Sequence, residues 1–533
     1  MMYRFIFLIS CIVRHLLADD YFIHWFDDQR REVYDEPIVL PVENGPIPEF
    51  LINGSLIRAG PSIGHTQKRN YTNYIDFFGR ITKWSFKTET LVNFQSALIK
   101  SNVYNSSNNI SDIPIHLTSE KPYPKFRGIP DLKNMDNTNV FMYAFQDANA
   151  NRILTFTDFH TSNDIHIESM RTLGNTLYND TLESIWSSSH PQEYRDPEND
   201  FDTVLVNWIG TKSIHDIGNM KLCIYKMGKD LIRRQVGCVE IPFLPYSIHS
   251  IAVAGDWAIV QIGPVELNMW KSGITDTLSE STVIKLDTDP TMIYVFDLKS
   301  SSEPNAKPIY IFTIPSPDNF FSFHKVNAVI KEDFVIELDL CVYLNMEGIL
   351  GEHVLGNLKD IFNSSVRDNM PYDCDALRRL SLNTKTGTYS FKDFQILDEY
   401  GNNYRLELVI HSPKFTNTPY CFVYAPVKHF AGSPRYQDMG IIKINLCMAD
   451  ATVNVVGSFH ENNTFVGEPI FVPDPSSNEE DRGVLLVITR TIRENLDESY
   501  LIVLNASNMN LISTTKAPFT LPFEFHGNYF DFF

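Results

Sequence analysis

The stretch Phe334-Val-Ile-Glu-Leu-Asp-Leu-Cys-Val342 decides the class of fold, because apolar side chains alternate in it with acidic ones. Alternation with a period of two is typical of a β-strand, in which successive side chains point to opposite faces. Short runs rich in Val, Ile, Phe and Tyr recur from about residue 50 to the end of the chain, and they predict an all-β protein. Examples are Val140–Phe145, Val204–Trp208, Lys221–Met227, Trp257–Ile262, Met292–Phe296, Val484–Thr489 and Tyr500–Asn505.

Clusters of turn-forming residues separate these runs, for example Asp289-Pro290, Pro315–Asn319 and Pro473–Asn478. Strands divided in this way are typical of a sandwich, a barrel or a propeller. No low-complexity linker interrupts the chain, so we expect one domain over residues 21–533. A closed propeller of several blades is the simplest fold at this length, because radial repetition leaves few exposed strand edges. Helical periodicity is scarce, and the best candidate for a helix is Met346–Phe362.

The composition limits the classes of function. The chain has 533 residues, of which 43% are hydrophobic, and a formal net charge of −20. The hydrophobic share is enough for a large core. The acidic balance argues against nucleic-acid binding, because a protein that holds phosphates needs a basic face. The 37 Phe and 24 Tyr fit a β-rich core and an apolar ligand.

The cysteines show no metal-finger or thioredoxin spacing, because no CxxC pair occurs. An odd count in a long chain favours buried free thiols over a disulfide framework, and free thiols are therefore our prediction. The seven cysteines are Cys11, Cys223, Cys238, Cys341, Cys374, Cys421 and Cys447.

The N-terminal residues 1–20 form either a signal-like segment or a disordered one. Arg4 precedes the apolar run Phe5–Val13, as in a short signal peptide, but Arg14 follows closely and Ala18 is a poor cleavage site. The run is too short to cross a bilayer as a helix. We therefore favour a cytoplasmic location, with secretion as the alternative that this run and the Asn-x-Ser/Thr sequons leave open.

Fifteen histidines occur, and their spacing does not reveal a metal site, since no HxH, HExxH or i,i+4 pair is present. Their surroundings are more informative. His249 follows Pro245-Tyr-Ser-Ile, His324 follows Phe320-Phe-Ser-Phe, and His526 follows Pro522-Phe-Glu-Phe. Each lies beside aromatic or β-branched residues at the start of an expected strand. Taken alone, such histidines fit either metal ligands or half-buried strand residues that bond to backbone carbonyls.

Several segments, in order along the chain, resemble the motifs of the carotenoid cleavage oxygenases, the family that includes the animal retinoid isomerase. The resemblance spans roughly residues 36–530. The segments are Asn53-Gly-Ser-Leu-Ile-Arg-Ala-Gly-Pro (family NGxLxRxGP), Met135-Asp-Asn-Thr-Asn-Val (DNxxVN), Ser189-His-Pro-Gln (AHPH), Ile248-His-Ser-Ile (VHSF), Phe323-His-Lys-Val-Asn (FHHIN), Gly467-Glu-Pro-Ile-Phe-Val (SEPxFV) and Leu504-Asn-Ala with Phe525-His-Gly (LNA and FHG).

The resemblance implies a seven-bladed β-propeller with a dome of loops and helices over an axial iron. It implies Fe(II) as the cofactor and four ligands, His190, His249, His324 and His526. Imidazole suits Fe(II), and four protein ligands leave two octahedral positions open. No catalytic side chain beyond the metal centre is predicted.

Three carboxylates are implied beside the ligands, because a ligating imidazole gives its other N–H to an acceptor. The matching positions are Asp158, Glu407 and Glu468. Asp158 departs from the family, which has Glu, and its shorter side chain predicts a weaker or shifted iron site. Two further departures are Gln192, where the family has a second His, and Phe77-Phe78-Gly79, which lacks an acid. A cysteine-containing motif of the animal members reads Lys121-Pro-Tyr-Pro-Lys and has no cysteine.

The segment Pro264–Ile274 stands where relatives expose apolar residues to membranes at the mouth of a substrate tunnel. It contains Leu267, Met269 and Trp270, which fit such a mouth or an ordinary capping helix equally well. An insoluble substrate favours some peripheral membrane contact. The charge of −20 disfavours simple electrostatic adhesion to anionic lipid.

The resemblance therefore predicts an oxygenase that cleaves a double bond of a carotenoid or apocarotenoid with O2 and gives aldehyde or ketone products of the retinal type. Two alternatives remain open. One is isomerohydrolase action on a retinyl ester, which uses the same iron without O2. The other is a non-catalytic carotenoid-binding propeller, suggested by Asp158 and by the altered Phe77-Phe78-Gly79.

Overall fold

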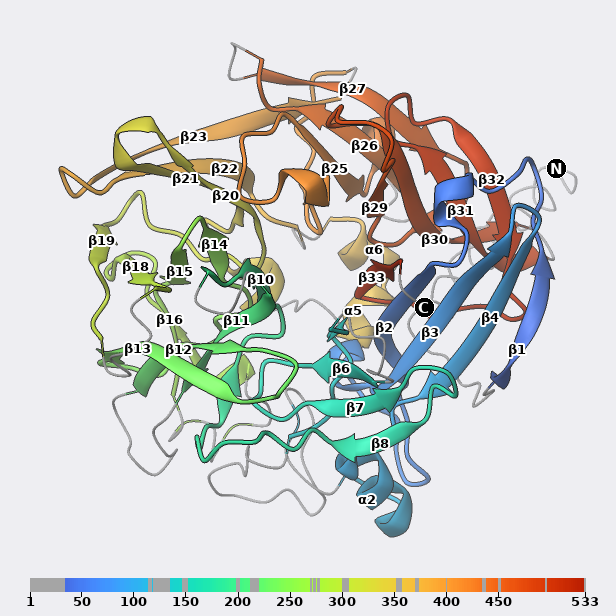
Figure 1. Cartoon of the computed structure of the whole chain (residues 1–533), viewed down its shortest axis with the longest axis horizontal. Coiled ribbons are helices and arrows are strands. Elements are labelled where there is room, and N and C mark those ends of the chain that lie inside the picture. The colour runs from blue at the N-terminus through green and yellow to red at the C-terminus, as the bar shows by residue number, and fades with distance from the viewer. Residues whose placement is uncertain are drawn as a thin grey trace, which may run out of the picture.

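Seven blades of antiparallel β-strands surround a central axis in the structure, a computed structural model of the chain (Figure 1). The predicted seven-bladed propeller is confirmed. The structure describes residues 34–113, 117, 135–145, 152–197, 202–210, 220–268, 271, 275, 279–299, 306–350, 357–369, 373–398, 400–433, 438–448, 452–493 and 496–531. The signal-like or disordered segment 1–20 and the Lys121–Lys125 motif lie outside these residues.

The first three blades are built from β1 to β13 and the C-terminal strand β33. The first blade contains β1 (Tyr34–Pro41), β2 (Ser55–Ile63), β3 (Phe78–Thr88), β4 (Leu91–Leu98) and β33 (His526–Phe530); the second contains β5 (Phe141–Tyr143), β6 (Arg152–Phe156), β7 (Asn163–His166) and β8 (Thr172–Asn175). The third contains β9 (Trp186–Ser187), β10 (Gln192–Arg195), β11 (Thr203–Gly210), β12 (Met220–Met227) and β13 (Arg233–Ile241).

The next three blades follow in chain order, and two of them share one sheet through the parallel pairing of β23 with β27. The fourth contains β14 (Ala252–Ala254), β15 (Trp257–Ile262), β18 (Thr291–Asp297) and β19 (Tyr310–Ile314). The fifth contains β20 (Lys325–Lys331), β21 (Val335–Val342), β22 (Ala376–Asn383) and β23 (Thr388–Leu397). The sixth contains β24 (Ile410–His411), β25 (Phe422–Val427), β26 (Gly440–Asn445) and β27 (Thr452–His460).

The seventh blade lies beside the first, where the ring closes (Figure 1). It contains β28 (Thr464–Val466), β29 (Ile470–Pro473), β30 (Gly483–Arg493), β31 (Leu496–Asn505) and β32 (Leu511–Lys516). The strand β33, at the end of the chain, pairs antiparallel with β2 of the first blade. Residues from both ends of the described chain therefore share one sheet.

The stretch that predicted the fold forms β21. Ile336, Leu338 and Leu340 are fully buried on one face, as their spacing of two requires. The opposite face is also covered, because Asp339 is 2% exposed and pairs with Arg379 at 2.7 Å. Of the acidic positions of the pattern, Asp339 is therefore buried beside an arginine, whereas Glu337 is partly exposed and pairs with Lys331 at 3.3 Å.

Irregular connections and short helices cover one end of the axis. Since β14 and β20 begin beside His249 and His324, their antiparallel neighbours β15 and β21 end there. The hairpin β16 (Val265–Leu267) and β17 (Thr282–Ile284) follows β15, whereas α4 (Glu347–Leu350), α5 (Leu358–Ile361) and α6 (Ser364–Arg367) follow β21. The helix α2 (Asn102–Ile110) follows β4. These connections and helices form the predicted dome. Where one helix was expected over Met346–Phe362, the described residues contain the two short helices α4 and α5.

Single 3-10 turns complete the described elements. They are η1 (Glu49–Leu51), η2 (Tyr74–Asp76), η5 (Ser279–Ser281), η6 (Glu332–Phe334), η7 (Pro413–Phe415) and η8 (Phe430–Gly432).

The prediction of free thiols is wrong for four cysteines. Cys223 on β12 and Cys238 on β13 are opposite each other in register and form a disulfide. Cys421 and Cys447, which flank the paired strands β25 and β26, form a second. Cys341 and Cys374 are buried free thiols, as predicted. Register across a hairpin brought the first pair together, and spacing along the chain does not reveal it.

Candidate metal centre

Four histidines converge at the dome end of the axis. Each histidine lies at the start of a strand. His190 stands shortly before β10, His249 shortly before β14 and His324 directly before β20, and His526 is the first residue of β33. One ring nitrogen from each of the four lies within 4.8 Å of the corresponding nitrogens of the others. Each inner strand of a propeller begins near the axis, so residues more than three hundred positions apart meet there.

The four imidazole rings surround a common point. The His190 ring centroid lies 4.8 Å from that of His249, 5.2 Å from that of His324 and 4.3 Å from that of His526. Nε2 of His190 and Nε2 of His249 are 3.1 Å apart. Two imidazole nitrogens at right angles on one ion, each at about 2.1 Å, would be separated by about 3 Å. The spacing fits two neighbouring positions of an octahedron.

Three of the rings are each held by one carboxylate. Nδ1 of His249 is 2.9 Å from Oδ1 of Asp158. Nδ1 of His324 is 2.6 Å from Oε2 of Glu407, and Nδ1 of His526 is 2.9 Å from Oε1 of Glu468. Each pairing turns Nδ1 outward and leaves Nε2 directed at the centre, which is the orientation that a metal-ligating histidine needs. The structure thus brings together all seven residues selected from the sequence.

Asp158 reaches its histidine despite its shorter side chain. Both of its carboxylate oxygens lie near Nδ1 of His249, at 2.9 and 3.1 Å. Each of the two glutamates, in contrast, presents one oxygen to its histidine. The shorter acid therefore meets its ring with two oxygens, whereas each glutamate of the site meets its ring with one.

Charge and burial set the protonation of the site. Burial, together with the neighbouring rings of His526 and His249, holds the pKa of His190 well below its ordinary value. Burial alone would lower the pKa of His324, but the Glu407 carboxylate outweighs it and raises that pKa. Burial opposes ionisation of Glu407, yet His324 and Tyr343 lower its pKa to about 2. His190 is thus neutral, and His324 pairs with an ionised acid.

This donor set fits a divalent transition metal. Neutral imidazoles suit iron, zinc, copper and nickel, and here no carboxylate among the described residues points at the centre. Nε2 of His324 is buried and has no hydrogen-bond partner among the described atoms, which is costly unless a ligand occupies that direction. The cluster is compatible with a metal ion held by four nitrogens.

Sequence reasoning did not identify the residues that hold Glu468 and Glu407 in place. Arg58, fully buried in β2, donates through Nη1 to the backbone carbonyl of Glu468 at 2.9 Å. Tyr343 donates its hydroxyl to Oε1 of Glu407 at 2.5 Å. Arg58 is the arginine of the Asn53–Pro61 motif, so the motif itself carried a signal. The contact of Tyr343 had no such signal in the sequence, because Glu407 lies far from Tyr343 along the chain.

The departures at Phe77-Phe78-Gly79 belong to the apolar core. Phe77 and Phe78 are 0% and 2% exposed and pack with Tyr71 and Tyr74. Of the residues predicted for a tunnel mouth, Leu267 is 5% exposed and lies inside β16. Leu267 is therefore buried in the core, and whether this segment forms a tunnel mouth stays a prediction. Met269 and Trp270 lie outside the described residues.

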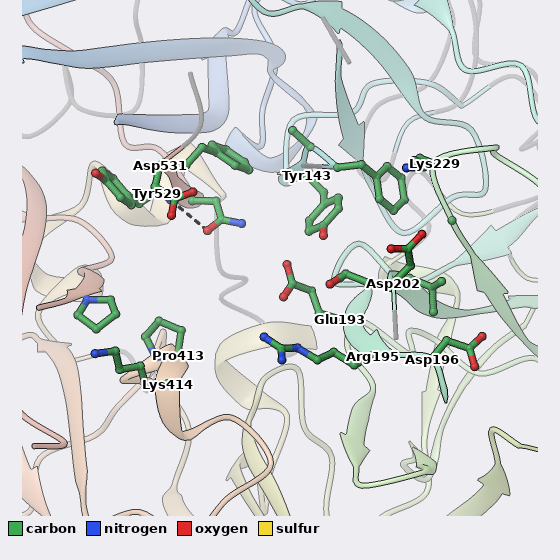
Figure 2. A pocket seen from close by; sticks show the side chains of 18 of the residues that line it. Tyr143, Glu193, Arg195, Asp196, Asp202, Lys229, Pro413, Lys414, Tyr529 and Asp531 are labelled. Atoms are coloured by element: carbon green, nitrogen blue, oxygen red, sulfur yellow. Dashed lines mark hydrogen bonds between the residues drawn. The ribbon is translucent and has the colours of Figure 1, made fainter. Parts of the chain in front are cut away.

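A cavity of about 1120 Å³ lies farther along the same inner strands, toward the end opposite the dome (Figure 2). Phe141 contacts the His190 ring at 5.0 Å, whereas Tyr143, two residues on, lines the cavity. Figure 2 shows Tyr143 and Glu193 pointing toward one another into this space, with Arg195 beside them. The lining carries many charges, so it does not suit an apolar polyene.

The comparisons with known proteins agree over most of the chain. A family model described as "Retinal pigment epithelial membrane protein" (RPE65) matches residues 26–531. The mitochondrial carotenoid-cleaving dioxygenase of Homo sapiens is 23% identical, over 91% of this chain and 87% of that protein. The apocarotenoid-15,15'-oxygenase of Synechocystis is 24% identical, over 91% of each chain.

Solved structures show the same fold. A chimera of apocarotenoid oxygenase and RPE65 superposes with a TM-score of 0.76 at 21% identity, over 96% of this chain and 98% of that one. The cobalt-substituted Synechocystis apocarotenoid oxygenase gives a TM-score of 0.75 at 21% identity, with the same coverage. The architecture is shared over nearly the full length of these proteins.

Proposed function

Because the chain belongs to the RPE65 family of carotenoid cleavage oxygenases, we propose that it is an iron(II) enzyme that cleaves a double bond of a carotenoid or apocarotenoid with O2. The products would be two carbonyl compounds, aldehydes or ketones of the retinal type. The observation that carries the proposal is the convergence of four histidine nitrogens within 4.8 Å, three of them on rings held by carboxylates.

His190, His249, His324 and His526 would hold the iron through their Nε2 atoms. When bound there, iron(II) would provide one-electron chemistry toward dioxygen, which zinc cannot provide and which the proposed cleavage requires. The carboxylates of Asp158, Glu407 and Glu468 stay on the outer side of the rings, so they orient the ligands without neutralising the ion directly. Four nitrogen ligands leave two positions for small molecules.

The surroundings of the histidines favour an apolar substrate on the dome side. The Phe141 ring lies 5.0 Å from His190, and the Phe323 ring lies 5.5 Å from His249 and 5.7 Å from Tyr343. Aromatic faces of this kind suit a conjugated chain that has no hydrogen-bonding groups. The opposite end of the axis has the charged cavity of Figure 2, which argues for entry of the polyene through the dome.

The test is product analysis after anaerobic loading of the purified protein with Fe(II), followed by a panel of carotenoids and apocarotenoids under 18O2. We expect near one equivalent of iron and two labelled carbonyl products from at least one substrate. Unlabelled product would favour isomerohydrolase chemistry, which needs no O2. Iron far below one equivalent, with no product from any carotenoid, would contradict the proposal and favour the non-catalytic carotenoid-binding propeller.

His324→Ala should abolish iron binding, because it removes a ligand whose orientation is fixed by Glu407 at 2.6 Å. A matched control is His166→Ala on β7, which removes an imidazole outside the four-histidine cluster. Elemental analysis after dialysis measures both. If the His324→Ala protein kept its iron, His324 would not be a ligand.

We propose peripheral membrane contact because the expected substrate is insoluble. None of the described helices is long and apolar enough to span a membrane. The longest described helix, α2, has 9 residues, whereas a bilayer span takes about 20 apolar ones. We propose that contact involves the surface around the dome, because the polyene is proposed to enter there. Sedimentation with carotenoid-loaded neutral vesicles measures it.

A further inference from the structure

Asp158 meets His249 in a geometry that needs support from both sides. Both oxygens of Asp158 face one N–H, at 2.9 and 3.1 Å, so neither oxygen is reserved for a second donor. The glutamates are different, since each keeps its second oxygen for another donor. Oε1 of Glu407 accepts from Tyr343 at 2.5 Å, and Oε2 of Glu468 accepts from the Gly527 N–H at 3.1 Å.

Two serine hydroxyls flank the aspartate. Ser247 donates to Oδ2 of Asp158 at 3.0 Å. The Ser189 hydroxyl lies 3.2 Å from Nδ1 of His249 and 3.3 Å from the backbone carbonyl of His249, and it is also a hydrogen-bond partner of the Asp158 carboxylate. Ser189 is fully buried, so its hydroxyl has little access to water as an alternative partner.

The hydrogen bonds of Ser188, the serine next to Ser189, go to backbone atoms. The Ser188 hydroxyl donates to the carbonyl of His249 at 2.5 Å and accepts from the N–H of His190 at 2.9 Å. The N–H of Ser187 donates to the carbonyl of Asp158 at 3.1 Å. The run Ser187–Ser189 therefore ties together the segments that carry Asp158, His190 and His249, which enter three neighbouring blades.

We propose that Ser189 and Ser247 are positioning residues that clamp the short Asp158 carboxylate against His249, so that an aspartate orients this imidazole as the glutamates orient His324 and His526. The proposal rests on the proposed function, because the purpose of orienting His249 is to direct Nε2 at the metal. It assigns to two hydroxyls a role that would be unnecessary beside a longer acid.

The experiment is a cycle of variants read by titration with Co(II), an optical probe of the same nitrogen site. The serine pair Ser189→Ala with Ser247→Ala is made in the natural background and again with Asp158→Glu. In the natural background we expect Co(II) affinity to fall about tenfold or more, the usual loss when an orienting partner of a ligand is removed. In the Asp158→Glu background, where the longer side chain reaches the ring without a clamp, the same pair should change affinity by no more than about twofold.

Ser188→Ala is the matched control, because it removes a neighbouring hydroxyl that contacts backbone and not Asp158. Its effect on affinity should be equal in the two backgrounds. If the Ser189 and Ser247 substitutions also had equal effects in both backgrounds, the hydroxyls would be merely structural and the proposal would be overturned.

A second readout keeps the two proposals apart. The melting temperature of the metal-free variants, measured with chelator present, reports the hydrogen bonds without a metal. The serine substitutions should lower it more in the natural background than with Asp158→Glu, and equal lowering would overturn the clamp. Absence of Co(II) and Fe(II) binding by the unsubstituted protein would instead overturn the proposed function, while the melting temperatures would still decide the role of the serines.

Discussion

At the scale of single residues, the contact between His324 and Glu407 is the shortest of the three carboxylate–imidazole pairs, at 2.6 Å. Glu407 also accepts from the Tyr343 hydroxyl at 2.5 Å and from the Leu408 N–H at 3.0 Å. Hydrogen bonds to an ionised acceptor are stronger than neutral ones. Glu407 is therefore fixed by three donors, and it fixes the ring in turn.

Glu407→Gln should lower iron affinity about 10- to 100-fold, the usual effect of losing an orienting partner. A neutral amide accepts a weaker hydrogen bond from Nδ1 and can present an NH2 group to the ring instead. Iron content after dialysis against graded chelator measures the loss. Glu337→Gln is the control, since Glu337 pairs with Lys331 on β20, outside the four-histidine cluster. Unchanged affinity in Glu407→Gln would contradict the orienting role.

Tyr343→Phe tests the next contact outward. It removes the hydroxyl but keeps the ring in its apolar surroundings, where it packs against Phe321 and Phe323. Because Glu407 retains its bonds to His324 and Leu408, we expect a loss of affinity smaller than that of Glu407→Gln. An equal or larger loss would show that Tyr343, and not Glu407, dominates the orientation of His324.

The sequence allowed the histidines and acids to be predicted because each stands in a short motif with a recognisable order. It did not allow the contacts among them to be predicted. Whether an aspartate could replace a glutamate depended on Ser247 and Ser189, which approach it from other segments of the chain. A run of three serines before His190 was the available signal, but serine runs also occur in ordinary loops.

At the scale of elements, β24 carries a histidine that affects stability. His411 lies against the Tyr420 ring at 5.2 Å, and burial lowers its pKa to about 4. In the unfolded chain a histidine has a pKa of about 6.5. Between these values the unfolded state binds a proton that the folded state does not, so folding stability falls as pH drops from about 6.5 to about 4.

His411→Gln should flatten this part of the stability profile. The histidine protein should lose on the order of 2 kcal/mol more than the variant between pH 6.5 and pH 4, after allowance for partial solvent access to the ring. Chemical unfolding across this range measures the difference. Above about pH 6.5 the difference between the two proteins should be constant, which is the internal control. A parallel decline in both proteins would contradict the assignment.

The two disulfides give an element-scale prediction. Cys223–Cys238 joins β12 to β13 across 15 residues, and Cys421–Cys447 links the flanks of β25 and β26 across 26 residues. Loops of this size correspond to about 3 kcal/mol of stabilisation each. Cys223→Ala with Cys238→Ala should therefore lower the unfolding free energy, and so should reduction of the unsubstituted protein.

Alkylation of the unfolded, unreduced protein checks the pairing directly. We expect Cys341 and Cys374 to be labelled, together with Cys11, and the other four to be labelled only after reduction. A sample reduced first, in which all seven should react, is the control. Labelling of all seven without reduction would contradict the disulfides.

Strand prediction succeeded where alternation was strong, as in β21 and β30, because period-two patterns follow from backbone geometry. It was weaker for the dome. In the described part of Met346–Phe362, α4 ends at Leu350 and α5 begins at Leu358, and such short helices depend on packing more than on intrinsic propensity. Cysteine pairing was missed because it depends on strand register, which the count of cysteines does not contain.

At the scale of the whole molecule, the ring closes by strand pairing between distant parts of the chain. β33 pairs with β2 from Ala59↔His526 to Ser55↔Phe530. The close approach has a sequence signature, because a Cβ on Gly527 would lie 2.8 Å from Cγ of Arg58. The closing strand also begins with a proposed metal ligand and donates from Gly527 to Glu468 at 3.1 Å. The strand that closes the ring therefore also carries the fourth histidine of the cluster.

This coupling predicts different outcomes for two changes at the same place. His526→Ala removes one imidazole and keeps β33, so it should abolish or strongly weaken iron binding while the melting temperature of the metal-free protein changes little. A chain ending at Phe525 loses the imidazole and the strand, which leaves the edge of β2 unpaired in the first blade. It should lose iron and also melt at a clearly lower temperature.

Differential scanning calorimetry of both metal-free variants makes the comparison, because without metal the two differ chiefly in the strand. The backbone bonds of β33 are absent from the shortened chain, and Glu468 loses its donor Gly527. Equal melting temperatures would show that the ring is held by packing between blades alone, and that β33 serves only to deliver its histidine. A lower value for the shortened chain alone, together with loss of iron from both variants, would mean that this short strand closes the propeller and also supplies the fourth nitrogen of the proposed metal centre.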